Sequence, residues 1–320
     1  MNTEEAERFV KLSRDANWAF PTSFSNSAIV RPGGELWVER LSAERPALAQ
    51  AARVLVRSGD EDAAAELAAN VWRLWLMAND LDGGRALLAS VLDAGTPIPS
   101  RARALALYGD ALFAIKQGKL VESRDRAQAA LDAASETGDL DGRVLGLLGL
   151  SRATFEQGDI TGARSFAAEA RELARGLEPA MTQAPLHMLA QSVRASGDLD
   201  DAASLFEESL ALNRRIGDEG MVLVELHNLG HVEARRGRVD AAERCFSEAA
   251  ERADLDDPYD AALTDFNQAV VAFGRGDRGR AAELLGRAKA TLDELDAEMP
   301  SDDRSEFEWL EERLAADPVG

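Results

Sequence analysis

Short polar turns divide the chain into apolar-rich stretches of nearly constant length. Turns centred on glycine recur 39 or 40 residues apart, at Gly118, Gly158, Gly197, Gly237 and Gly276. Asn79 stands one step earlier, and asparagine can adopt the left-handed turn conformation that glycine favours. A second series is spaced by 79 residues, at Gly59, Gly138 and Gly217. The two series predict helical hairpins, with one turn inside each hairpin and the other between hairpins.

Small residues stand at fixed distances from these turns. Five residues after the turn, all six hairpins carry one: Gly84, Ser123, Ala163, Ala202, Ala242 and Ala281. Seven residues before it, five of six do so: Ala111, Ser151, Ala190, Gly230 and Ala269, with Trp72 as the exception. Nine residues after the turn, the side chain that would pack against this contact varies in size: Leu88, Ala127, Ala167, Phe206, Phe246 and Leu285. Small residues on both helices predict a close approach within each hairpin.

This combination of a glycine turn, a small residue on each helix and a bulky residue one turn later resembles the tetratricopeptide repeat. The similarity is greatest in His227-Asn228-Leu229-Gly230, followed by Gly237 and Ala242. The period near 40 exceeds the family's usual length of about 34 residues, so longer helices are expected. The resemblance implies an all-α, right-handed superhelical solenoid of about six hairpins plus terminal helices.

A second resemblance begins near residue 36. The run LWVERLSAERPALAQAARVLVRSGDEDAAAELAANVWRLWLMANDLDGGRALLASVL is similar to the start of the helical-repeat arm of bacterial signal-transduction NTPase transcription regulators. In those regulators the arm binds an inducer or a partner protein. The chain has neither a phosphate-binding loop nor a basic helix-turn-helix, so ATP hydrolysis and DNA binding are not carried over. The chain is either a stand-alone arm or a piece of a longer protein, and the initial Met favours the former.

The continuous repeat predicts a single helical-repeat domain over residues 1–320. Within it, residues 1–36 form an N-terminal helix and loop, residues 37–298 the repeats, and residues 299–320 a C-terminal capping helix. The first helix should span Thr3 to Ala16 with Thr3 as its N-cap. The following loop, Asn17 to Gly34, carries Trp18, Phe20 and Phe24, which either cover the open end of the solenoid or recognise a ligand.

The last segment has the pattern of a terminal cap. Phe307, Leu310 and Leu314 form an apolar stripe at helical spacing. The opposite face should be charged and turned to solvent, with Glu306, Glu308, Glu311 and Glu312. A polar outer face is typical of the helix that ends a solenoid.

Charge and composition exclude several classes of function. The net charge of −21 disfavours nucleic acid as a direct partner, because binding would require clustered Lys and Arg. No nucleophile elbow, metal-binding HExxH, nucleotide loop or Cys cluster occurs, so we expect neither an enzyme nor a cofactor. The chain has no 18-residue apolar run and no signal-peptide pattern, which predicts a cytoplasmic location. Exposed Trp-bearing end repeats would provide a route to a homodimer.

In tetratricopeptide folds the concave surface is lined by the first helix of each hairpin. The resemblance places its inner positions ten and six residues before the turn: Tyr108, Leu112, Leu148, Arg152, His187, Gln191, His227, His231, Phe266 and Val270. All three histidines of the chain fall in these two rows. An amide row, Asn70, Asn228 and Asn267, stands nine residues before the turn and could hold a peptide backbone, since an amide both donates and accepts. These amides could equally bond the adjacent helix.

Three interpretations of the histidines remain open. They form a polar floor for a ligand together with Arg152, Gln191, Arg194 and Arg235, or they bond between neighbouring repeats, or His227 and His231 bind a metal with His187. The candidate partner-binding residues are therefore Tyr108, Arg152, His187, Gln191, His227, Asn228, His231, Arg235, Phe266 and Asn267.

The predicted function is that of a non-catalytic binding module that recognises a peptide or protein in the concave groove. One alternative is a regulatory arm that senses a small-molecule effector and controls a transcription or signalling protein. Another is a structural scaffold that acts through its convex face.

Overall fold

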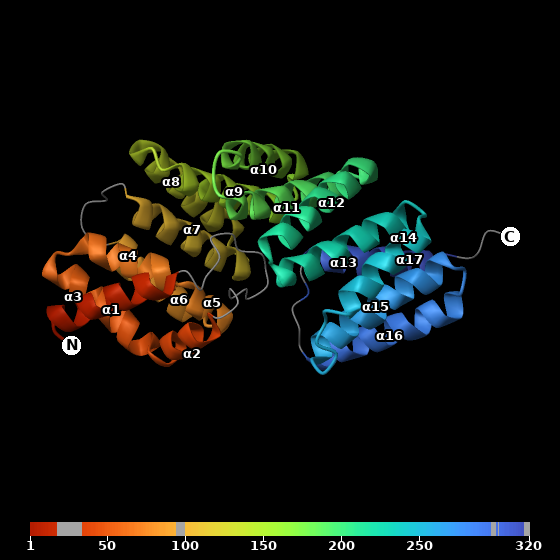
Figure 1. Ribbon diagram of the computed structural model, residues 1–320, viewed down its shortest axis with the longest axis horizontal. Helices are drawn as coiled ribbons and strands as arrows, with labels where there is room; N and C mark the ends of the chain where they lie inside the picture. Colours follow the sequence, from red (N-terminus) through yellow and green to blue (C-terminus); the bar gives the residue numbers. More distant parts are fainter. Residues whose placement is uncertain (18–33, 94–99, 296–298, 300, 317–320) are drawn as a thin grey trace. The chain divides into compact units, whose positions relative to one another are not determined.

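The protein is all-helical throughout the part of the chain that its computed structural model describes, which is residues 1–17, 34–93, 100–295, 299 and 301–316 (Figure 1). The all-α prediction is confirmed for these residues. The chain folds as two compact units, Met1–Ser192 and Val193–Gly320. The boundary falls inside one helix, near the middle of the predicted repeats. The expectation of a single domain stays a prediction.

The first unit begins with a helix that packs against the third and fourth. Its helices are α1 (Thr3–Ala16), α2 (Glu35–Ala43), α3 (Arg45–Ser58), α4 (Glu61–Val71), α5 (Arg73–Met77), α6 (Leu81–Leu92), α7 (Arg101–Lys116), α8 (Leu120–Thr137), α9 (Leu140–Glu156), α10 (Ile160–Ala174) and most of α11 (Pro179–Ala195). From α7 to α10 each helix packs on the next in sequence, as expected of stacked hairpins.

The second unit continues the pattern from the end of α11. Its helices are α12 (Leu199–Ile216), α13 (Glu219–Arg235), α14 (Val239–Ala250), α15 (Pro258–Gly274), α16 (Arg278–Glu294) and α17 (Ser301–Ala315) (Figure 1). α13 packs on α14, α15 on α16, and α13 also contacts α15. The first helices of successive hairpins therefore lie next to each other.

Both series of turns occur as predicted. Among the residues that the structure describes, Asn79 is the one non-glycine residue with a positive φ, at 52°. The glycines of both series have φ between 68° and 87°. The residue after the turn is usually an aspartate that caps the next helix, as where Asp198 accepts from the Asp201 amide. A left-handed residue followed by an Asp cap stops one helix and starts the next within two residues. These turns produce the six predicted hairpins.

The predicted small-residue contact is equally clear. A Cβ added to Gly230 on α13 would lie 2.3 Å from the Phe246 ring on α14. In the α9–α10 hairpin the small pair is Ser151 and Ala163, and the Ser151 hydroxyl donates to the Ala163 carbonyl at 2.9 Å. Close approach of the paired helices thus depends on residues too small to keep them apart.

Two details differ from expectation. The N-cap of α1 is Asn2 rather than Thr3, because the side chains of Asn2 and Glu5 exchange hydrogen bonds with each other's backbone amides. The first helix of the first predicted hairpin is divided at Trp72 into α4 and α5. Trp72 and Trp75 are core residues. The aromatic loop with Trp18, Phe20 and Phe24 lies outside the described residues.

The close contact at Gly230 gives a stability prediction. Gly230→Ala should lower the free energy of unfolding by about 1–2 kcal/mol, because the new methyl group must displace the buried Phe246 ring. Gly286→Ala, in the middle of α16 with nothing within 4 Å of the added Cβ, is the matched control. It should stabilise by about 0.5–1 kcal/mol through helix propensity. Urea unfolding measures both; a Gly230→Ala protein as stable as Gly286→Ala would contradict the close contact.

Candidate functional site

The ten predicted partner-binding residues are divided between the two units. Tyr108 on α7, Arg152 on α9, and His187 and Gln191 on α11 belong to the first unit. The other six belong to the second, on α13 and α15: His227, Asn228, His231, Arg235, Phe266 and Asn267. The second group is the more closely connected.

In the second unit these side chains gather on one surface. His227, His231 and Arg235 stand four residues apart on α13, so they share one side of that helix. The two imidazole rings are 4.5 Å apart between centroids, and His231 stacks on Phe266 of α15 at 5.0 Å. We call the surface formed by Arg194, His227, His231, Arg235, Phe266 and Asn267 the inner face of the second unit.

The C-terminal helix α17 lies on this inner face. Asp303 accepts a hydrogen bond from His227 Nε2 at 3.1 Å. Phe307 stacks on Phe266, with 3.6 Å between the ring centroids. Between these contacts, the carboxylate of Glu306 lies 3.2 Å from Arg235 Nη1 and 3.6 Å from Arg194 Nη1. Charge and stacking thus hold the N-terminal half of α17 against α13 and α15.

The C-terminal half of α17 is held by the last hairpin. Trp309 meets Phe273 edge-on at 6.0 Å, and Lys289 pairs with Glu311. Arg278 donates to the carbonyls of Arg313, Leu314 and Ala316 at 3.0, 2.7 and 2.8 Å. A cation at this position satisfies helix-end carbonyls and opposes the negative end of the helix dipole.

The prediction that Glu306 belongs to a solvent-facing charged surface is wrong. Its side chain is 1 % exposed, as buried as the apolar stripe of Phe307 and Leu310. Glu308 and Glu312 do face solvent. The contacts that Asp303, Glu306 and Phe307 make with the histidine rows were not predicted from the sequence. The spacing of these residues could have indicated the burial of Glu306. It stands three residues after Asp303 and four before Leu310, so it shares their side of the helix.

His231 is buried as a neutral imidazole. Its pKa lies well below the ordinary histidine value, chiefly because burial disfavours the cation, with His227, Arg194 and Arg235 adding repulsion. Its Nε2 donates to Asn267 Oδ1 at 3.1 Å, because an amide oxygen can only accept. Nδ1 therefore presents a lone pair 4.0 Å from Glu306 Oε2, and neither atom has a hydrogen-bond donor among the described residues.

The amide row bonds within the fold. Asn228 Oδ1 accepts from Arg194 at 3.0 Å while its amide donates to the Val224 carbonyl. Asn267 bonds His231, and Asn70 in the first unit donates to Ser13 at 3.2 Å. The bond from Asn228 to Val224 lies within α13, and the other three join different helices, which supports the packing alternative for the amides. Their role toward a partner stays a prediction.

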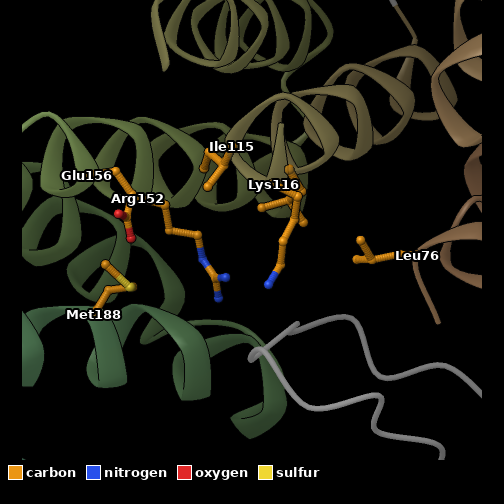
Figure 2. A pocket seen from close by; sticks show the side chains of 7 residues that line it. Leu76, Ile115, Lys116, Arg152, Glu156 and Met188 are labelled. Atoms are coloured by element: carbon orange, nitrogen blue, oxygen red, sulfur yellow. The ribbon is translucent and has the colours of Figure 1, made fainter. Parts of the chain in front are cut away.

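In the first unit the predicted residues border a pocket. Arg152 and Lys116 extend into the same space, bordered by Leu76, Leu112, Ile115, Glu156 and Met188 (Figure 2). The side chains come from α5, α7, α9 and α11. The pocket thus combines two cations and one carboxylate with apolar walls. Its chemistry suits a small ligand with an anionic group and an apolar body.

A further cation is buried in the first unit. Arg73 is 7 % exposed, lies over the Trp72 ring at 4.4 Å, and its Nε has no hydrogen-bond partner among the described residues. Burial lowers the pKa of Arg73 to about 10, so it stays charged at neutral pH. Tyr108 is fully buried beside Trp72, and burial raises the pKa of its hydroxyl. Tyr108 thus belongs to the core rather than to an open surface.

No group of three or more His, Cys, Asp or Glu side chains among the described residues could hold a metal ion. None of the helices described is both long and apolar enough to cross a membrane.

Residues 181–253 match the tetratricopeptide repeat family. These residues include His187, Gln191, His227, Asn228, His231 and Arg235. No curated protein matches the chain.

Solved structures show the same fold. A Rap protein complexed with Competence and Sporulation Factor matches 98% of this chain and 97% of its own, with TM-score 0.59 and 13% identity. The apo form of RapI matches 98% and 82%, with TM-score 0.57 and 13% identity. BtubC from P. vanneervenii matches 82% and 94%, with TM-score 0.52 and 19% identity. The tetratricopeptide-like solenoid fold is therefore confirmed, and identities this low show the fold alone.

Burial of neutral His231 predicts a pH dependence of stability. Between its lowered pKa and the ordinary value of 6.5, the unfolded chain binds a proton that the folded chain does not. This contribution to stability is complete above that ordinary value and is lost as the pH falls. The free energy of unfolding should therefore decrease more steeply between about pH 7.5 and pH 5 in the wild type than in His231→Gln.

Urea unfolding at a series of pH values measures the two slopes. His187→Gln, which removes a histidine from the other unit, controls for general effects of the substitution. Arg194, His227, Arg235 and Glu306 also face His231 and are present in both proteins, so the difference between the two slopes reports on His231. Equal slopes for wild type and His231→Gln would contradict the burial of a neutral imidazole.

Proposed function

We propose that the protein is a non-catalytic binding module and that the inner face of the second unit binds a segment of a protein partner. The observation that supports this most directly is that the same face already accommodates a helix through His227, Arg235 and Phe266. A surface that combines cations, imidazoles and a stacking aromatic ring can recognise both charge and shape. Such mixtures with buried aromatic and Arg anchors are typical of protein interfaces.

The fold supports a binding role in a general way. Tetratricopeptide solenoids present the first helices of successive hairpins side by side, which creates an extended binding surface. A Rap protein with this fold is complexed with Competence and Sporulation Factor. In the present chain, an acidic segment is the best fit, because Arg194, Arg235 and two histidines meet on one face. The two arginines can pair with carboxylates that dock there.

A peptide-display screen on the full chain tests this proposal. We expect enriched peptides to be acidic with an aromatic residue, and photoreactive versions to crosslink to α13 and α15. Arg235→Glu should weaken their binding about tenfold or more, because it places a carboxylate opposite theirs. Arg244→Glu, on the exposed side of α14, is the matched control and should have little effect. Crosslinks confined to α14 and α16 would contradict the proposal.

A second candidate function is favoured by the pocket of the first unit. A small ligand with an anionic group could pair with Lys116 and Arg152 while its apolar part contacts Leu76 and Met188 (Figure 2). Occupancy of this pocket would make the chain a ligand-sensing regulatory arm. The resemblance of residues 36–95 to the arms of bacterial transcription regulators suggests a transcription or signalling protein as the controlled partner; that resemblance stays a hypothesis.

Thermal unfolding with octanoate as the probe tests the pocket. Octanoate should raise the melting temperature through preferential binding to the folded state, whereas octylamine, of similar size and opposite charge, should not. The effect should disappear in Arg152→Gln/Lys116→Gln and persist in Arg164→Gln, an exposed cation on α10. Equal shifts by octanoate and octylamine, or an octanoate shift unchanged by the double substitution, would contradict an anion-binding pocket.

A further inference from the structure

α17 crosses the inner face of the second unit instead of only covering its last hairpin. Its first turns meet α13 through Asp303 and His227, and Glu306 reaches Arg194 at the end of α11. Its C-terminus is held by Arg278 at the start of α16. A terminal cap needs to cover only the final hairpin. α17 instead lies across residues from three successive hairpins, on the face where we place the partner.

We propose that α17 is an intramolecular occupant of the partner site, and that the partner is an acidic amphipathic helix that binds by displacing it. This inference rests on the proposed function and specifies both the partner's chemistry and the regulation of the site. While α17 is docked, the inner face is closed to other segments. A partner helix gains access in the fraction of molecules in which α17 has left.

The contacts of α17 define what such a partner presents. It carries an acidic residue for His227, a second carboxylate three residues later for Arg194 and Arg235, and an aromatic ring next to it for Phe266. In α17 these are Asp303, Glu306 and Phe307, followed by Leu310 at the next turn. The spacing i, i+3, i+4 and i+7 places all four on one side of a helix.

The charge of α17 complements the surface beneath it. Residues 301–315 contain six acidic and two basic residues, against the cations and imidazoles of the inner face. A buried carboxylate is stable only when paired, so Glu306 depends on Arg194 and Arg235. Loss of the Glu306 charge should therefore release the helix more effectively than loss of an exposed glutamate.

The fit of α17 is incomplete at its centre. Glu306 Oε2 and His231 Nδ1 are both buried acceptors without a donor among the described residues. Unpaired buried acceptors weaken an interaction relative to a fully bonded one. A partner helix that presented a donor to His231 Nδ1, and its own carboxylate to Arg194 and Arg235, would bind the same face better than α17 does. This difference in affinity is what displacement requires.

Competition between α17 and a labelled copy of it tests the inference in the full chain. The probe is a fluorescent synthetic peptide of residues 301–316, and its binding is followed by anisotropy. In Glu306→Gln/Phe307→Ala, the probe should bind about tenfold or more tightly than in the wild type, because apparent affinity scales with the fraction of open sites. Glu308→Gln/Glu312→Ala, on the exposed side of the same helix, should bind the probe as the wild type does.

Trp309 provides a second measurement that does not depend on substitution of the docking residues. It is the only tryptophan after Trp75, and it packs edge-on against Phe273. With fluorotryptophan in the wild-type chain and Trp309→Phe to assign its signal, unlabelled probe peptide should shift the Trp309 ¹⁹F resonance toward its position in Glu306→Gln/Phe307→Ala. Circular dichroism checks that this variant keeps its helix content.

The outcomes separate this inference from the proposed function. If peptides from the display screen crosslink to α13 and α15 equally well in wild type and in Glu306→Gln/Phe307→Ala, the face binds partners but α17 does not compete, and the inference fails alone. If neither the probe nor any displayed peptide binds either protein, both fail. Binding of the probe without a change at Trp309 would place it elsewhere and also overturn the inference.

Discussion

A left-handed residue ends the first helix of every hairpin, and this constraint determines where the remaining side chains fall. The chain reverses direction at Asn79 and at each turn glycine. An aspartate such as Asp198 usually caps the next helix immediately afterwards. Small residues near Gly230 or Ser151 then allow the two helices to meet closely. Because the same geometry repeats, equivalent positions of α13 and α15 come to lie side by side. The inner face is a consequence of that repetition.

The inner face concentrates positive charge in a strongly acidic chain. Arg194 and Arg235 meet there, and the buried carboxylate of Glu306 lies between the two arginines. Burying a carboxylate costs several kcal/mol, on the order of what two good ion pairs restore. The arrangement therefore contributes more to selecting an occupant than to overall stability. An occupant without a carboxylate at this position would cover Arg194 and Arg235 without pairing their charges, which would weaken its binding.

Sequence patterns were sufficient for features that depend on local chemistry. The turns at Gly118 and Asn79, the six hairpins and the small contact at Gly230 all follow from residues close in the chain. The position of α17 does not, because it depends on packing between residues about 70 positions apart, as with Arg235 and Glu306. A helical stripe of Phe307, Leu310 and Leu314 predicts which side is buried but not that Glu306 is buried with it. The burial of Tyr108 likewise depends on Trp72 of the preceding hairpin.

Two of the interpretations of the histidines are compatible in the second unit: bonding between neighbouring repeats and contact with an occupant of the inner face. His231 bonds Asn267 between neighbouring hairpins and also lies under α17, next to Phe266 and Glu306. Burial by its surroundings keeps its pKa low. If an occupant leaves, His231 becomes more hydrated, and its pKa rises toward the ordinary value. Protonation and occupancy are then linked in both directions, so a fall in pH favours the open face and an occupant favours the neutral imidazole.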